Sequence, residues 1–361
     1  MLITFILYTG LAILFAKIIK RSSGMHVGIL VLICIAMALF SAFRGEAGTD
    51  SWSYRNIYEM PSAYFVRTDV EIGYKILMYL CNRIRLPYVA LFFIMSFFTS
   101  FFFLLAIREE RNDIDIETAF LVYFFDFYLA SFNTMRQSLA ISLCMYGIIK
   151  WVKREYKIAL PVLGLAMLFH YPSIISFVLL IYIAVLRTCM YKVAVIISVA
   201  TVTWMINNIE YAIEFAGYLT NGGHYQTFFY GMSDNTKEGI ILYLIKIAPI
   251  FLFALWARSR YKNSERIKIY LGVMILGYAV SLLGEVYTTY VERLGFYMSC
   301  FRIILLGYCA NDVFKIQFSK YNGCILGKKT AKAAILAYVF VVYYYSVFVA
   351  GSNNLVPYGV L

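Results

Sequence analysis

Apolar and polar stretches alternate along almost the whole chain. Runs of about 17–25 predominantly apolar residues recur, which is the length that an α-helix needs to cross about 30 Å of hydrocarbon. We assign twelve such segments, at residues 2–19, 25–43, 88–107, 117–131, 135–151, 157–170, 172–186, 191–207, 239–257, 268–284, 294–311 and 332–350. No linker rich in Ser, Pro or Gly and no internal repeat interrupts the pattern. It predicts an all-α polytopic membrane protein in which residues 1–361 form a single integral membrane domain.

Composition supports the same class of protein. Hydrophobic residues make up 62% of the 361 residues, and charged residues only 14%. A soluble domain of this length could not bury so much apolar surface, because even large domains leave a substantial fraction exposed.

The basic residues indicate how the chain crosses the membrane. If the loop after the first span is cytoplasmic, the cytoplasmic side holds 21 of the 32 basic residues and 8 acidic residues. The opposite side holds 11 basic and 11 acidic residues, and Asp126 lies within a span. The net charge of +12 is then entirely cytoplasmic, as the positive-inside rule expects. The charge therefore reflects topology, argues against nucleic-acid binding, and predicts that both termini are extracytoplasmic.

Residues 72–86, IGYKILMYLCNRIRL, are apolar enough to suggest a further span. If they crossed the membrane, every later loop would change sides and 18 of the 21 cytoplasmic basic residues would face outward. The segment is also short, so we expect an interfacial or re-entrant helix. The two long outer loops are predicted at residues 44–87 and 208–238. The second resembles either a surface helix that could cover an outward cavity or an inert interfacial loop.

Cysteine and histidine usage argues against a metal centre. The seven cysteines are odd in number, most lie within predicted spans, and there is no CxxC motif. The three histidines share no ligand spacing. We therefore expect no metal and no cofactor. No cleavable signal peptide is expected either, since residues 1–16 carry no basic region.

Unusual polar residues gather at the predicted outer ends of the spans, whereas the cytoplasmic loops resemble ordinary charged turns. An ionisable group in hydrocarbon costs about 2.5–3.5 kcal/mol on insertion scales, so it usually has a partner or a function. The outer set is Arg44, Asp50, Tyr54, Glu71, Arg136, Gln137, His170, Glu285, Glu292 and Arg293. Chemistry, if present, is predicted on the outer face.

Structural explanations remain open for several of these residues. Tyr54 fits an interfacial aromatic belt, and Thr49 or Asp50 can cap a following helix. Arg136 lies in the first turn of a helix, where the helix dipole disfavours a cation, so it suggests an anionic partner or an arginine that reaches the headgroups. A lone His such as His170 is more often structural.

Two further arginines lie near the predicted eleventh span. Arg293 and Tyr297 are four residues apart, so they share a helix face. Arg302 lies deeper in the bilayer and is predicted to form a structural ion pair, for which Asp126 is a candidate partner.

Five short motifs together resemble the EpsG family of bacterial polysaccharide proteins, which are related to Wzy-type O-antigen and capsule polymerases. In order, they are Arg44-x3-Gly48-Thr49-Asp50-x3-Tyr54, Glu71-x-Gly73-Tyr74, Asn133-x2-Arg136-Gln137, Phe169-His170-x2-Ser173 and Arg293-x3-Tyr297. Tyr171-Pro172 and Ile174 depart from the small residues common after the histidine, and the terminal spans carry no motif of the family. The resemblance implies a GT-C-like membrane fold.

The resemblance also implies an activity: transfer of a growing glycan from undecaprenyl diphosphate to a lipid-linked repeat unit, outside the bacterial cytoplasmic (inner) membrane and without a metal. Arg136 and Arg293 would bind the diphosphate. Arg44 would either bind the same anion or orient Asp50. Asp50, Glu71 and His170 are the base candidates. Tyr54, Asn133, Gln137 and Tyr297 would hold sugar rings. Expected partners are the lipid-linked oligosaccharide, the bilayer and a chain-length regulator.

Two other functions remain open. A flippase for lipid-linked oligosaccharides would have a similar number of spans, but it should show charged residues along a path through the bilayer and often pseudo-repeated halves. A membrane transferase that adds a side-branch sugar or acyl group could use the same outward arginines and acids.

Overall fold

The computed structural model describes residues 1–22, 26–65, 67, 70–188, 191–208, 237–287, 289–311 and 328–359, and all regular structure in them is helical. The helices are α1 (Leu2–Arg21), α2 (Val27–Ala42), α3 (Ser51–Tyr58), α4 (Ile72–Arg83), α5 (Tyr88–Glu109), α6 (Ile116–Tyr123), α7 (Met135–Val152), α8 (Tyr156–Phe169), α9 (Ile175–Leu186), α10 (Tyr191–Asn207), α13 (Lys237–Arg260), α14 (Glu265–Tyr287), α15 (Thr289–Ser299), α16 (Arg302–Asn311) and α17 (Lys328–Tyr344). Single 3₁₀ or π turns are η1 (Pro61–Ala63), η2 (Phe124–Tyr128), η3 (Ala130–Phe132), η4 (Tyr171–Ile174), η5 (Tyr345–Val349) and η6 (Ser352–Asn354).

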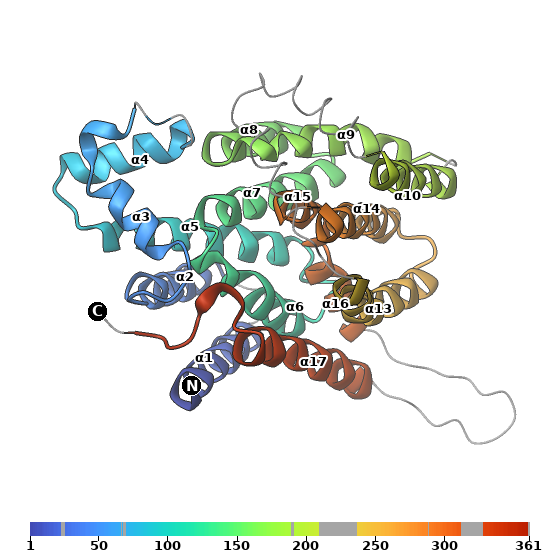
Figure 1. Ribbon diagram of the computed structural model, residues 1–361. Coiled ribbons are helices and arrows are strands. Elements are labelled where there is room, and N and C mark those ends of the chain that lie inside the picture. The colour runs from blue at the N-terminus through green and yellow to red at the C-terminus, as the bar shows by residue number, and fades with distance from the viewer. Residues whose placement is uncertain are drawn as a thin grey trace, which may run out of the picture.

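The helices pack as a bundle around α7 (Figure 1). α7 lies between α5 and α8, α2 packs on α5, and α14 packs on α15. α7 is buried along most of its length, as are α6 and α16. The helices α1, α13 and α17 expose most of their apolar residues, as helices at a lipid-facing surface do.

Apolar helices occupy the predicted spans. Within the described residues, six segments are long and apolar enough to cross a membrane: Leu2–Arg21, Tyr88–Glu109, Ile241–Ser259, Glu265–Gly284, Val291–Asn311 and Ala331–Val349. Four apolar helices are shorter: Val27–Ala42, Tyr156–Phe169, Tyr171–Leu186 and Lys192–Thr201. The chain is therefore a helical membrane protein, while the full set of twelve spans stays a prediction.

Three predicted segments differ in detail. Within residues 72–86, Ile72–Arg83 form the 12-residue helix α4, which is too short to span and agrees with an interfacial helix. The predicted span 294–311 is two helices, α15 and α16, interrupted at Cys300 and Phe301. The predicted surface helix of the loop 208–238 lies outside the described residues.

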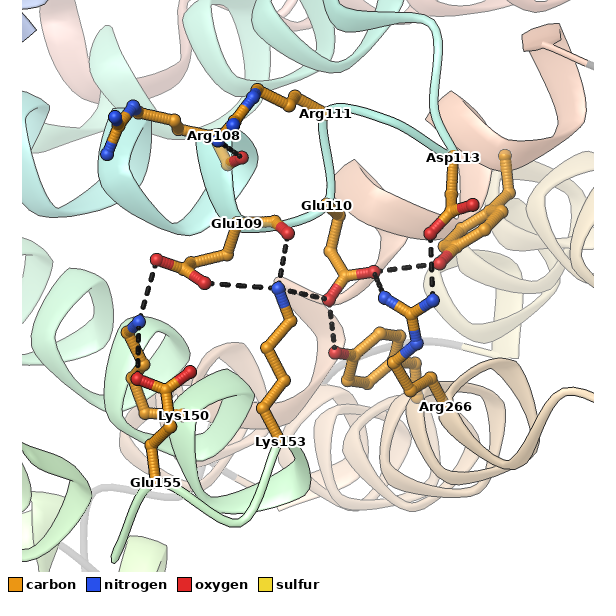
Figure 2. Close-up of polar contacts among 11 residues, drawn as sticks. Arg108, Glu109, Glu110, Arg111, Asp113, Lys150, Lys153, Glu155 and Arg266 are labelled. Atoms are coloured by element: carbon orange, nitrogen blue, oxygen red, sulfur yellow. Dashed lines mark hydrogen bonds and ion pairs between the residues drawn. The ribbon is translucent and has the colours of Figure 1, made fainter. Parts of the chain in front are cut away.

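One end of the bundle carries a buried ion network. The sequence pattern predicted ordinary charged turns in these loops. Glu110 follows α5, and its side chain is 0% exposed. Its carboxylate accepts from Arg266 Nη1 at 2.7 Å, from Tyr308 Oη at 2.8 Å and from Tyr270 Oη at 3.0 Å, while Lys153 Nζ lies 3.5 Å away. Figure 2 shows Glu110 after the end of α5, Lys153 after the end of α7 and Arg266 of α14 meeting at this point. The expectation was wrong because these partners lie far apart in the sequence.

A second network lies at the same ends of other helices. Lys332 of α17 contacts Asp115 at 2.9 Å and also Glu117, and Lys20 of α1 reaches Glu117 at 2.8 Å. Asn311 at the end of α16 donates to the Asp113 carbonyl at 3.1 Å, next to the Glu110 network. These contacts connect the positively charged loops to one another at this end.

The opposite end holds the start of α1 and residues 351–359, which we name the C-terminal segment. Tyr358 donates its backbone N–H to Thr4 Oγ1 at 3.3 Å, and Tyr8 Oη donates to the Leu355 carbonyl at 2.8 Å. The N–H of Gly48 donates to the Asn354 carbonyl at 2.9 Å. The C-terminal segment therefore packs on the polar stretch that follows α2, where the sequence places its first candidate site residues.

Candidate functional site

An arginine–carboxylate pair joins the start of α7 to the start of α4. Arg136 lies in the first turn of α7, Glu71 directly precedes α4, and Arg136 Nη1 contacts Glu71 Oε2. The Glu71 side chain is 7% exposed and that of Arg136 is 22% exposed. Burial raises the pKa of the Glu71 carboxyl, although Arg136 acts in the opposite direction. The anionic partner that the sequence predicts for Arg136 is thus supplied by the protein itself.

Gly73 allows α4 to approach α8 closely. A Cβ at this position would lie 2.6 Å from the Leu168 carbonyl oxygen, so a side chain there would force the helices apart. The close approach brings Glu71 beside the hairpin after α8, where the backbone of Tyr171 also binds its carboxylate. This contact gives a physical reason for the motif Glu71-x-Gly73-Tyr74.

Two tyrosines cover the arginine. Arg136 lies 5.7 Å from the ring centre of Tyr74 and also hydrogen-bonds Tyr54, and the two rings meet edge to face at 6.1 Å. Tyr74 is fully buried, and its hydroxyl has no hydrogen-bond partner within the described part of the chain. An unsatisfied buried hydroxyl costs about 1–3 kcal/mol, which a bound water or ligand would relieve.

His170 lies beside this pair. Its Nδ1 is 2.9 Å from Tyr297 Oη of α15. Burial, followed by the positive charges of Arg136 and Arg293, lowers the pKa of His170 to about 3. The imidazole is therefore neutral at physiological pH, and it is a weak base. We name Tyr54, Glu71, Tyr74, Arg136, His170 and Tyr297 the Arg136 cluster.

Gln137 connects the cluster to α15. Its Nε2 donates to the Arg293 carbonyl at 2.8 Å, and the residue is buried. Arg293 lies one helical turn before Tyr297 on α15, as the spacing predicts. Helix α15 therefore contacts Gln137 through Arg293 and His170 through Tyr297.

Asn133 and Asp50 belong to a neighbouring contact, close to the C-terminal segment. Asn133 Oδ1 accepts from the Asp50 N–H at 2.9 Å and from Thr49 Oγ1, and Asn133 Nδ2 donates to Asn353 Oδ1 at 3.2 Å. Asp50 stands at the N-cap position of α3, but its side chain makes no cap hydrogen bond. Asn133 is buried and held by protein groups, while Asp50 is partly exposed.

Arg44 does not fit the predicted role of an anion ligand. It is 0% exposed, and its guanidinium donates to the carbonyls of Ser41, Ala47 and Phe132 at 2.9, 3.0 and 3.0 Å. The remaining contacts are the hydroxyls of Ser41 and Ser51, the Met135 sulfur, and the rings of Phe92 and Phe132 at 4.3 and 5.0 Å.

These contacts occupy the donors of Arg44 with groups of the protein itself. It holds the chain after α2 against the loop before α7, where Gly48, at φ +103°, passes close to the Phe132 carbonyl. The alternative role, orienting Asp50, receives no support from a direct contact.

A cavity of about 410 Å³ lies on the other side of α7. It is lined by η2, α7, α13 to α17 and the C-terminal segment, and its charged lining residues are Asp126, Lys246, Glu292, Arg293 and Arg302. Arg302 Nε binds Asp126 Oδ2 at 2.8 Å, which confirms the ion pair expected from the sequence. Of the ten predicted site residues, Arg293 is the one that lines this cavity.

Sequence reasoning assigned no role to several residues of these two sites. Tyr74 lay within a quoted motif, and the missing signal was its burial. Lys246 is a lysine within an apolar stretch, a feature that marks functional positions in membranes. Asn353 carried no signal, because only the folded chain brings the C-terminal segment to Asn133.

The fold and the sites define a helical membrane protein with a polar cluster and a charged cavity near one end of its bundle. Within this class, the chain belongs to the EpsG family, whose model matches residues 27–360, from the start of α2 to the C-terminal segment. EpsG is a Wzy-like polymerase family. No curated protein and no solved structure matches the chain.

Proposed function

We propose that this protein is a bacterial polysaccharide polymerase. It transfers a glycan from undecaprenyl diphosphate to a lipid-linked repeat unit on the extracytoplasmic face of the cytoplasmic membrane. Membership of the EpsG family supports this proposal. The observation that carries it is the Arg136 cluster, in which a buried carboxylate of raised pKa contacts a guanidinium beside a neutral imidazole and three tyrosines.

The reaction that we propose forms one glycosidic bond. A hydroxyl oxygen of the acceptor sugar attacks the anomeric carbon of the growing glycan. The bond from that carbon to the diphosphate oxygen breaks, and undecaprenyl diphosphate leaves with the electron pair. The hydroxyl proton passes to a base. Because diphosphate is already a good leaving group, the protein needs mainly to neutralise its charge and to accept that proton.

Glu71 is our candidate for the base. Burial raises the pKa of its carboxyl, which makes the carboxylate a better proton acceptor than an exposed one. The pKa of His170, at about 3, makes its imidazole a weak base. We therefore assign His170, with Tyr297, to orienting the acceptor sugar, and Asp50 stays the second candidate for the base.

Arg136 couples substrate binding to this base. A guanidinium presents forked N–H donors that match phosphate oxygens, so an anionic substrate competes with Glu71 for Arg136. A carboxylate released from its cation accepts a proton more readily. Tyr54, Tyr74 and Gln137 provide rings, hydroxyls and an amide that can hold a sugar.

A flippase for lipid-linked oligosaccharides is the second candidate function. The observation that favours it is the Arg302–Asp126 pair, which places two charged groups in the interior of the bundle beside a cavity.

Reconstitution separates these functions. The purified protein is placed in proteoliposomes with a defined undecaprenyl-diphosphate-linked repeat unit, and the product is separated on a gel. We expect a ladder of polymer. Translocated but unextended monomer would favour the flippase, and monomer carrying an added sugar or acyl group would favour a side-branch transferase.

Variants test the residue assignments in the same assay. Glu71→Gln should slow polymerisation by about 10²–10⁴-fold, the usual contribution of a general base, and Arg136→Lys should also slow it. Arg55→Gln is the control, because Arg55 forms an exposed pair with Glu59 on α3. Wild-type ladders from Glu71→Gln and Arg136→Lys at normal membrane abundance would remove both residues from the mechanism.

A further inference from the structure

The charged cavity is a compartment separate from the Arg136 cluster. Its volume of about 410 Å³ lies within the usual range of ligand sites, about 300–1,000 Å³. Thr134, the N-cap residue of α7, and Ser138 line it, whereas Arg136, between them in sequence, contacts Glu71 just before α4. Successive positions of one helix thus face two sites, and α7 separates them.

The cavity reaches from one end of the bundle towards its middle. Ser352 and Asn353, which line its outer part, belong to the C-terminal segment beside Asn133. Arg302 begins the 10-residue helix α16, whose far end joins the network around Glu110. At 1.5 Å per residue, Arg302 is about 15 Å along α16 from that end, so it lies well inside the bundle.

Arg302 retains hydrogen-bonding capacity towards the cavity. Its Nε binds Asp126, and its Nη1 donates to Tyr278 Oη at 3.2 Å. Among the described residues, the structure gives Nη2 no acceptor, and the side chain is 14% exposed. Two N–H groups of a guanidinium are therefore available to an anion inside the bundle.

The charges of the lining also favour an anion. The three basic side chains are Lys246, Arg293 and Arg302, against Asp126 and Glu292. This excess of one positive charge in the lining attracts an anion into the cavity. Arginine donors suit phosphate oxygens in particular.

The remaining lining suits a hydrocarbon chain. Apolar residues of α13 and α17 line the cavity, among them Ile250 and Val342, and both helices have largely exposed apolar surfaces. Both pack on α16. A ligand in the cavity therefore lies next to the two helices that face lipid.

We propose that this cavity binds the diphosphate end of a polyprenyl-linked substrate, with Arg302 and Arg293 as its basic ligands and the polyprenyl chain leaving between α13 and α17. The choice of lipid rests on the proposed function. Arg293 also lies one turn from Tyr297, which contacts His170. The donor lipid and the acceptor sugar then occupy compartments that meet at α15.

Binding of a polyprenyl diphosphate without sugar, measured in neutral-lipid nanodiscs, tests the proposal without turnover. The first variant combines Arg302→Gln with Asp126→Asn, which removes the pair and leaves no unpaired buried charge. The second, Val342→Trp, fills the cavity and keeps every charge. The control combines Arg55→Gln with Glu59→Gln, an exposed pair on α3. Each protein must elute as a single species and melt like the wild type, and Val342→Trp tests the site even where the double variant does not fold.

We expect the dissociation constant to rise at least tenfold in both cavity variants and to stay within about twofold in the control. Inorganic diphosphate and phosphatidylglycerol should bind at least tenfold more weakly than the polyprenyl diphosphate. Wild-type affinity in both cavity variants would overturn the proposal, as would equal affinity for either of the other two phosphates. A protein that binds as expected but makes no polymer would refute the polymerase function and leave this site in place.

Discussion

Arg44 has two candidate roles. The sequence suggests that it binds substrate, whereas the structure supports a structural role. The perturbation is Arg44→Lys, which keeps the positive charge but shortens the reach and replaces five N–H donors with three. The guanidinium donates to three backbone carbonyls, at 2.9–3.0 Å, and to two hydroxyls. An ammonium group leaves at least two of these acceptors without a donor.

The magnitude follows from those contacts. A hydrogen bond to a charged group contributes about 1.5–3 kcal/mol, so losing two should destabilise the protein by about 3–6 kcal/mol. The loss of the planar contacts with Phe92 and Phe132 acts in the same direction. We expect a lower melting temperature and lower membrane abundance, while the folded fraction keeps its affinity for the lipid-linked substrate.

Thermal unfolding in nanodiscs, membrane abundance and substrate affinity are measured together for three proteins. Arg55→Lys is the matched control, since its pair with Glu59 is about half exposed and should contribute within about 1 kcal/mol. Arg136→Lys should show the reverse pattern, with weaker activity at a nearly unchanged melting temperature. An Arg44→Lys protein that melts and accumulates like the wild type, but binds substrate poorly, would refute the structural role.

Three further predictions concern protonation, the buried network and metal dependence. Polymerisation should fall at acid pH as Glu71 takes up a proton, at a pKa raised above 4.5. This acid limb of the pH profile should disappear in the residual activity of Glu71→Gln. An inflection of the pH profile near 6.5 that is lost in His170→Gln would contradict the pKa of about 3 for that imidazole. Glu110→Gln should destabilise the protein by about 1–3 kcal/mol, because the buried carboxylate that accepts from Arg266, Tyr270 and Tyr308 is lost, although Arg266 keeps its contact with Asp113. Glu155→Gln, at a 40% exposed side chain, should have little effect, and equal melting temperatures would show that the network adds no stability. Removal of divalent cations with EDTA should leave polymerisation unchanged, and activity restored specifically by one added metal would disprove the metal-independent mechanism.

The sequence alone determined where the helices lie. Each of the twelve predicted spans falls on apolar helix, although the span 294–311 is divided between α15 and α16. The segment 72–86 contains the short helix α4, as its length required. The sequence also identified Asp126 as a candidate partner of Arg302, because charged groups inside a bundle need opposite charges and few were present. These properties depend on local composition and on the cost of burying backbone and charge.

The tertiary structure alone decided which polar residues meet. Glu71 and Arg136 are 65 residues apart, His170 and Tyr297 are 127 apart, and Asn133 and Asn353 are 220 apart. Arg44 and Arg136 look alike in sequence, yet one is enclosed by backbone carbonyls and the other lies at the edge of a cluster. Such differences follow from the close approach of particular helices, such as α4 on α8 at Gly73, and the hydrophobic period of a helix does not encode which neighbour it meets.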